Sequence, residues 1–208
     1  MINTYATNVD GVPKTDFDNM RKIAGNIAYV THDEINFREL SSVSGGKTQC
    51  MYYLDSLEEC MRSVDFNAFA NPEPSSLESK TLVYSVRWLA CVYIVRDAVR
   101  QEGAPDIIKD TQKRMLDTFN TLINLAKKKD GEYGASWCKR GGIGAWFTTV
   151  RKFDRMHTQL AAVNYDPFCV VGDADSTESL EETIKDGINY LLLIIEKRQA
   201  IYELSQSS

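Results

Sequence analysis

The amino-acid sequence predicts an all-α helical bundle. Three observations predict it: apolar residues recur at spacings of three and four through five long segments, short connectors separate those segments, and none has the signature of a β-hairpin. The chain has 208 residues, of which 43% are hydrophobic, so it can bury one core. We expect a single all-α domain over residues 49–204, with residues 1–48 as an N-terminal extension packed on it.

The first four helix candidates precede residue 102. Two short ones belong to the extension, at about 16–29 and after the capping box "THDE" at 31–34. The first core helix starts at residue 49 and stops before "NPEPSS". The second opens at the capping box "SSLE" and covers about 75–101. Its Val, Tyr and Trp content would also suit a strand, but a length of roughly 25 residues without a turn signal favours a mostly buried helix.

Three further helices complete the predicted bundle. Pro105 is well placed at the start of the third, which the exposed run "KKKDG" is expected to end. The fourth covers about 143–163, and the last begins at the "SLEE" box near Ser179. The fourth helix should turn one apolar stripe to the core, formed by Ile143, Trp146, Val150, Phe153, His157 and Leu160.

Composition argues against several classes of function. Lys and Arg number 24 against 29 Asp and Glu, and this net charge of −5 disfavours bulk binding to nucleic acid. The five cysteines are scattered and there are only two histidines, so no zinc-ligand spacing is present. The most apolar run, residues 81–95, is shorter than the roughly 20 residues of a membrane span. The N-terminus lacks a secretory signal pattern, so we expect a cytoplasmic protein that has no membrane partner.

The stretch "SGGKTQ", residues 44–49, contains the Gly-Lys-Thr of a phosphate-binding loop. That motif needs a glycine five residues before Gly46, where Ser41 stands. It also needs a preceding apolar strand, which "NFRELSSV" does not supply. We therefore interpret the stretch as a turn that leads into the first core helix.

Residues 127–155 form a basic segment within an acidic chain. They hold eight Lys and Arg against three Asp and Glu, a local balance of +5. Glycines at 141, 142 and 144 stand where the fourth helix begins, so backbone N–H groups could approach an anion there without a Cβ in the way. The groups expected to bind phosphate are Lys139, Arg140, Gly142, Arg151, Lys152 and Arg155.

Two aromatic residues precede these glycines. Tyr133 and Trp137 present rings that could stack on a base or contact a ribose. The alternative is that both are buried anchors that hold the loop, and for Trp137 the two interpretations stay open. Trp146 is assigned to the core, because it belongs to the apolar stripe of the fourth helix.

Residues 173–186 form a complementary acidic segment, with six Asp and Glu against one Lys and a local balance of −5. Glu178, Glu182, Asp186 and Asn189 follow at spacings of four, four and three, which places them on one side of the last helix. Glu182 and Asp186, one turn apart, could hold Mg²⁺. The alternative is that this acidic side faces water or pairs with the basic helix, which would contribute little.

Two stretches resemble a known family: "YGASWCKRGGIGAWFTTVRKFDRM" and "ETIKDGINYLLLIIEKR". They are similar to the nucleotide modification associated domain 1 family, small all-α proteins found largely in phages and bacteria. The resemblance covers about residues 130–200. The matched positions are Tyr133, Gly134, Ser136, Trp137, Arg151, Lys152, Asp154, Arg155, Asp186, Asn189 and Tyr190. The resemblance implies a nucleotide or a modified base as the ligand, and it makes these residues candidates for binding it.

The last helix is also similar to that of the MazG-type all-α nucleotide pyrophosphatases. Those proteins hold Mg²⁺ with paired acidic motifs on helices. This chain departs from the pattern, because Glu182 and Asp186 are four residues apart and no clear Glu-x-x-Glu partner motif accompanies them. The departure puts hydrolysis in doubt but leaves the ligand class unchanged.

We therefore expect a phage-type nucleotide-binding protein of nucleotide or modified-base metabolism, with its ligand between the last two long helices. If the protein turns the ligand over, Glu182 and Asp186 are the expected catalytic pair, holding the Mg²⁺ that activates water for attack on a phosphoanhydride. The alternative is a non-catalytic binder that sequesters a nucleotide signal of host defence. A protein-interaction module is a third interpretation, and a homo-oligomer could complete the site.

Overall fold

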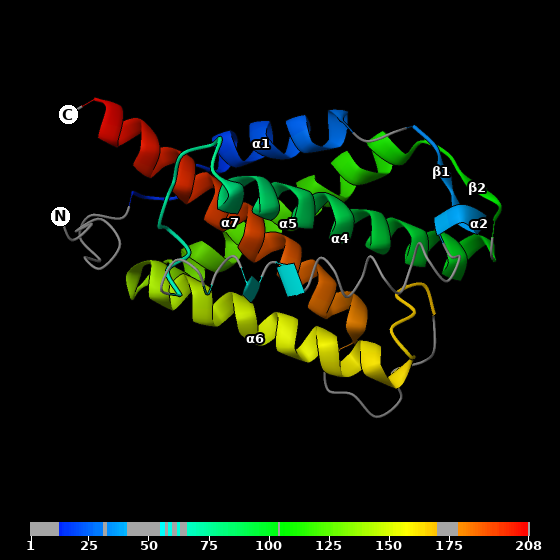
Figure 1. Ribbon diagram of the computed structural model, residues 1–208. Helices are drawn as coiled ribbons and strands as arrows, with labels where there is room; N and C mark the ends of the chain where they lie inside the picture. Colours follow the sequence, from blue (N-terminus) through cyan, green and yellow to red (C-terminus); the bar gives the residue numbers. More distant parts are fainter. Residues whose placement is uncertain are drawn as a thin grey trace.

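Helix α7 (Leu180–Gln206) is the central element of the fold. Our computed structural model describes residues 13–30, 33–40, 55–56, 58–59, 62, 66–103, 105–169 and 179–207. Within these ranges, α7 packs against α1 (Phe17–Tyr29), α4 (Leu77–Glu102), α5 (Thr111–Tyr133) and α6 (Gly141–Ala162). Figure 1 shows α7 crossing the molecule, with α6 on one side and α4 on the other. The fold is an all-α bundle, as the sequence predicts.

The amino terminus of α7 is held by the capping box that the sequence predicts. Ser179 Oγ accepts a hydrogen bond from the N–H of Glu182 at 3.2 Å, and Glu182 Oε2 accepts one from the N–H of Ser179 at 3.0 Å. Other helices pack against α7 on several sides, so polar as well as apolar side chains of α7 are buried. The buried polar ones are Thr183, Asn189, Glu196, Lys197 and Arg198.

Side-chain caps also begin α1 and α4. Asp16 accepts from two backbone N–H groups of the first turn of α1. Ser76 Oγ accepts from the N–H of Ser79 at 3.2 Å, so the cap of α4 is Ser76, one residue after the expected Ser75. The rest of α4 is a mostly buried helix, as its length predicts.

The start of α5 differs from its prediction. The helix begins at Thr111 instead of Pro105, because strand β2 (Ile107–Ile108) comes between them and pairs antiparallel with β1 (Ile35–Asn36). The N–H of Thr111 donates to the carbonyl of Asp33 at 3.0 Å. These tertiary contacts override the helix-start preference of proline, which is only a local signal.

The end of α5 also differs, because the helix continues through "KKKDG" to Tyr133. Gly134 ends it in the left-handed conformation, with φ of 57°, and its N–H donates to the carbonyl of Asp130 at 2.8 Å. The turn glycine is therefore Gly134, and Gly131 lies within the helix.

Helix α6 begins two residues earlier than expected, at Gly141. Three of its predicted core residues, Trp146, Phe153 and Leu160, are buried, but Ile143 is 41% exposed. The prediction for Ile143 is wrong because the buried side of α6 passes through Ala145, Thr149 and Met156, which leaves Ile143 on the flank. Val150 and His157 lie half-buried at the edge of that side.

Several expectations lie outside the described residues. They are most of the first core helix, the stretch "SGGKTQ", Glu178 and the first two residues of "THDE". The short helix expected after "THDE" corresponds to α2 (Phe37–Leu40), which directly follows β1. Among the helices that the structure describes, none combines the length and the apolar character needed to cross a membrane.

Candidate functional site

Six of the predicted site residues line one cavity between α5, the 3₁₀ helix η3 (Ser136–Cys138) and α7. They are Tyr133, Ser136, Trp137, Asp186, Asn189 and Tyr190. The remaining wall comes from Ala126, Lys129, Asp130, Ala135 and Leu193. The cavity volume is about 100 Å³. The motifs of two separate stretches of sequence therefore meet at a single place in the fold.

The turn after α5 places Trp137 over α7. Gly134 and Ala135 are both left-handed, with φ of 57° and 47°, and they reverse the chain between α5 and η3. A left-handed alanine costs roughly 1–2 kcal/mol, so the surrounding contacts must hold this turn in place. One such contact is the edge-to-face pair of Trp137 and Phe69, whose ring centroids are 6.3 Å apart. Trp137 is therefore a buried anchor that also lines the cavity.

Three buried polar atoms, in residues that line the cavity, have no hydrogen-bond partner among the described residues. They are Asn189 Oδ1, Trp137 Nε1 and Asp130 Oδ1, each fully screened from solvent. The Asn189 side chain is 5% exposed and that of Trp137 is 9% exposed. A buried polar atom without a partner costs about 1–3 kcal/mol, and such atoms are uncommon in folded proteins. Three of them belong to residues that line one cavity, which makes this cavity the candidate site.

Asp186 lies at the cavity wall between two lysines from different helices. Its Oδ2 is 2.7 Å from Lys152 Nζ on α6, and its Oδ1 is 3.8 Å from Lys129 Nζ on α5. The carboxylate at the edge of the buried face is thus paired. Burial raises the pKa of the neighbouring Tyr190 phenol, and Asp186 raises it further, whereas Lys152 and Arg151 lower it.

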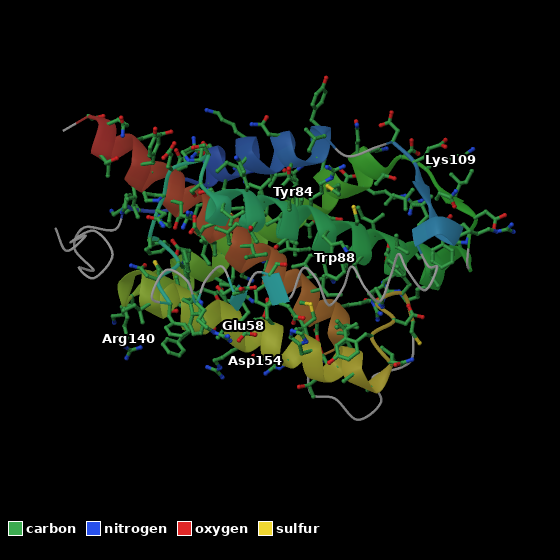
Figure 2. All side chains as sticks on the ribbon, in the orientation of Figure 1. Glu58, Tyr84, Trp88, Lys109, Arg140 and Asp154 are labelled. Carbon is green, nitrogen blue, oxygen red and sulfur yellow. The ribbon has the colours of Figure 1, made fainter. Side chains whose placement is uncertain are left out.

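The remaining predicted residues do not line this cavity. Gly134 is the exposed cap of α5, and the others lie on or near α6 or at the start of α7: Lys139, Arg140, Gly142, Arg151, Asp154, Arg155 and Glu182. Figure 2 shows Arg140 and Asp154 on the outer side of α6, away from α7. Of the cations on α6, Lys152 pairs with Asp186, and Arg151 acts electrostatically on the neighbouring Tyr190.

Gly142 has a packing role that the sequence did not indicate. A Cβ at this position would lie 1.7 Å from Asn67 Oδ1 and 2.9 Å from the backbone N of Phe69. The Gly142 carbonyl also accepts a hydrogen bond from the N–H of Ala68 at 3.1 Å. Close approach of the 67–69 segment therefore gives a packing reason for the glycine, and its contact with an anion stays a prediction.

Glu182 and Asp186 lie one turn apart on α7 but have different partners. Glu182 is exposed, and its carboxylate belongs to the capping box with Ser179. Asp186 pairs with lysines. Across the described ranges, no three side chains of His, Cys, Asp or Glu are grouped so that they could hold a metal ion.

Sequence reasoning missed Lys129 and Asp130, because "KKKDG" was interpreted as the exposed end of a helix. A signal was present in the spacing. Ala126, Asp130 and Tyr133 follow one another at intervals of four and three, which places them on one side of a continuing helix. Extending the predicted helix to Gly134 would have placed Asp130 on the same side of the helix as Tyr133, close to the motif residues Ser136 and Trp137.

A buried ion pair lies one turn beyond the cavity along α7. Glu196 Oε2 is 3.4 Å from Lys197 Nζ, and both side chains are 1% exposed. Burial lowers the pKa of the Lys197 amine and raises the pKa of the Glu196 carboxyl, since each charged form loses its hydration. The Lys197 charge also acts on Cys138 and Asp130, so this pair lies close behind the site.

A larger groove of about 540 Å³ lies between α1, α4, α7 and the segment around Pro72 and Pro74. Its walls are mainly apolar, and no sequence motif predicts it. Its one fully buried cation, Arg198, donates hydrogen bonds to backbone carbonyls and serine hydroxyls, so the groove shows no unmet hydrogen-bonding demand comparable to that of the cavity. The polar cavity is therefore the stronger candidate site.

Comparison with known proteins identifies no relative of this chain. The chain matches no family model, no curated protein and no solved structure. The resemblance to the nucleotide modification associated domain 1 family accordingly stays a prediction. The case for a ligand site rests on the cavity and on the predicted residues that line it.

Proposed function

We propose that this protein binds a nucleotide or a nucleotide-derived small molecule, with the base in the polar cavity between α5, η3 and α7. The observation that carries the proposal is that six residues predicted from two separate stretches of sequence line this one cavity. Three residues of its wall, Asn189, Trp137 and Asp130, also have a buried polar atom without a partner among the described residues. A flat ring would contact the aromatic and apolar wall, and side-chain movement on binding would bring the buried polar atoms to its hydrogen-bonding groups. The residues predicted from sequence supply most of that wall.

The size of the cavity supports entry of one ring. A volume of about 100 Å³ is well below the 300–1,000 Å³ typical of whole ligand sites. The sugar and phosphates of a nucleotide would then lie outside, beside Lys129 and Lys152. Tyr133 is 68% exposed and lines the cavity, so its ring could pack on the part of the ligand that remains outside.

These contacts favour binding over hydrolysis. Water activation by Mg²⁺ would require Glu182 to leave its capping box and Asp186 to leave Lys152. Glu182 would lose its hydrogen bond from Ser179, and Asp186 would lose its ion pair with Lys152. We therefore propose that the protein binds its ligand without turning it over. The experiment below includes a separate assay for turnover.

Isothermal titration calorimetry of the purified chain with the common nucleoside monophosphates and triphosphates tests the proposal. The informative variant is Asn189→Leu, which removes the buried amide, and we expect it to weaken binding at least about tenfold. Asn120→Leu is the matched control, because Asn120 is exposed on α5 and does not line the cavity. Failure of every nucleotide to bind would overturn the proposal, as would equal affinity of Asn189→Leu and the unaltered chain.

The turnover arm uses the tightest ligand found by calorimetry. The protein is incubated with that nucleotide and Mg²⁺, denatured, and the ligand is analysed by mass spectrometry. We expect the intact nucleotide. Release of pyrophosphate or phosphate that depends on Glu182 and Asp186 would instead make the protein an enzyme, and it would contradict the assignment to non-catalytic binders.

A further inference from the structure

We propose that the groove between α1, α4 and α7 is a second binding site, which takes an organic anion with an apolar body, such as a fatty-acid carboxylate. The juxtaposition that supports it is a mainly apolar groove whose charged wall residues, among those described, are all cations. The groove shares no described wall residue with the polar cavity, so this inference does not depend on the proposed function.

Apolar side chains from three helices line the groove. Helix α1, which lies beside α4 in Figure 1, contributes Ile23, Ile27 and Val30 from one of its sides. Val83 of α4 and Ile195 of α7 add to this apolar wall. Side chains of neighbouring helices normally interdigitate and fill the space between them, whereas here a volume of about 540 Å³ stays open. Whole small-molecule sites typically measure roughly 300–1,000 Å³, so the groove has the size of a site for one small molecule.

The α4 side of the groove is positively charged. Lys80 and Arg87 lie two turns apart on the same side of α4, and among the described residues neither has an ion-pair or hydrogen-bond partner. No Asp or Glu belongs to the described part of the wall, although the chain as a whole has a net charge of −5. Long Lys and Arg side chains reorient readily toward a bound group. The wall therefore attracts an anion, and no described carboxylate in it repels one.

Arg198 adds a buried positive charge from α7. Its side chain is 1% exposed, and the hydrogen bonds it donates go to carbonyls and hydroxyls, which are neutral groups. Its hydrogen bonding is thus satisfied without a carboxylate that neutralises the charge by direct contact. Glu78 acts on this charge electrostatically, but Glu78 does not line the groove. Because charges interact more strongly where water is excluded, Arg198 favours an anion in the groove even without contacting it.

The ligand class follows from these two features. The apolar wall buries an alkyl chain or a ring, and the cations bind a carboxylate or another anionic head group. Decanoate is a suitable probe, because decanol and decyltrimethylammonium carry the same alkyl chain with a neutral and a positive head group. Comparing the three probes separates the contribution of the charge from that of the apolar wall.

Isothermal titration calorimetry of the unaltered protein with each probe, below its micelle-forming concentration, provides the first test. We expect decanoate to bind most tightly, decanol next and decyltrimethylammonium most weakly. The two ions should differ in affinity by at least about tenfold, because two cations attract one of them and repel the other. Equal affinity for the three probes would overturn the inference, as would failure of decanoate to bind.

The double variant Lys80→Met, Arg87→Met provides the second test, because it removes both charges and keeps long side chains. Decanoate should then bind about threefold to thirtyfold more weakly, as the loss of two partly screened charge pairs implies, and decanol should bind as before. Lys109→Met, Lys113→Met is the matched control, since both lysines are exposed and lie outside the groove. It should keep the decanoate affinity within about twofold. An unchanged decanoate affinity in the first double variant would overturn the inference.

A second copy of this chain is the other occupant to test. Tyr84 is 55% exposed in the groove wall, so Tyr84→Glu would place a carboxylate in an interface formed there. We expect this variant to bind decanoate more weakly and to keep the oligomeric state of the unaltered chain, measured by light scattering. A dimer that Tyr84→Glu dissociates, together with no decanoate binding, would overturn the inference and make the groove a contact between copies. Nucleotide affinity should be the same in all these variants, so a failure here leaves the proposed function intact.

Discussion

Helix α7 buries several polar side chains, and two of them, Arg198 and Asn189, differ in whether their hydrogen bonding is complete. Arg198 is 1% exposed and donates to the carbonyls of Ala68, Ala70 and Asn71 and to the hydroxyl of Ser79. Asn189, nine residues earlier, is 5% exposed and has an amide oxygen without a partner. Arg198 is thus satisfied, whereas Asn189 Oδ1, like Glu196 Oε2 and Lys197 Nζ of the buried ion pair, has no hydrogen-bond partner among the described residues.

Under the proposed function, this difference separates a structural polar group from one that contacts ligand. The Arg198 guanidinium joins α7 to the segment before α4, and burial lowers its pKa to about 10, so the surrounding carbonyls must compensate for lost hydration. The Asn189 amide oxygen has no hydrogen-bond partner among the described residues, so its burial costs folding free energy that no hydrogen bond offsets. We infer that the first group maintains the fold and that the second is kept for a ligand.

The largest expected effect is at Arg198. Replacing it with methionine in Arg198→Met leaves the carbonyls of 68, 70 and 71 without a donor, so we expect the free energy of unfolding to fall by about 3–5 kcal/mol. Urea denaturation followed by circular dichroism measures it. Arg140→Met is the control, because Arg140 is exposed and its loss should change stability by less than about 0.5 kcal/mol. A loss below about 1 kcal/mol in Arg198→Met would contradict a structural role.

Gly142 tests whether the start of α6 is built for packing or for an anion. Gly142→Ala places a Cβ against Asn67 Oδ1 and the backbone N of Phe69, so we expect a loss of about 1–3 kcal/mol. Gly131→Ala is the control, because nothing lies within 4 Å of its Cβ position and it should stabilise helix α5 by about 0.5–1 kcal/mol. Thermal unfolding compares the two. Equal melting temperatures would refute the packing explanation.

A smaller effect is expected at the capping box of α7. Ser179→Ala removes the side chain that accepts from the N–H of Glu182, and we expect a loss of about 1 kcal/mol in unfolding free energy. Nucleotide affinity should not change, because Ser179 does not line the cavity. Chemical denaturation and calorimetry measure the two quantities on one preparation. A large loss of affinity with little loss of stability would instead connect the acidic start of α7 with ligand binding.

Much of the fold was predictable because helical periodicity and caps are local signals. The start of α7 at Ser179 and the long buried helix α4 follow from them. The start of α5 was not predictable in this way, because the pairing of β2 with β1 is a contact between residues far apart in sequence. Pro105 gave a correct local preference that this pairing overrides.

The site was predictable only in part, for the same reason. The sequence identified the motif around Trp137 and the Asp186–Asn189 face of α7, and both line the cavity. It also placed Arg151 and Arg155 away from the apolar stripe of α6, and they are exposed. The sequence could not show how α6 is oriented beside α7. This orientation brings Lys152 to Asp186, while the exposed Arg151 and Arg155 do not line the cavity.

The smallest expected change in stability is at Asn189. Whether substitution raises or lowers the free energy of unfolding is the sharpest test of the difference between Asn189 and Arg198. Asn189→Leu replaces an unpartnered buried amide with an apolar side chain, so the free energy of unfolding should stay constant or rise by up to about 1 kcal/mol. Asn120→Leu on the exposed side of α5 should change it by less than about 0.5 kcal/mol. Urea denaturation without nucleotide measures both variants. A loss of more than about 2 kcal/mol would show that Asn189 contributes to the fold as Arg198 does, because only a group with partners in the folded protein can lose them on substitution.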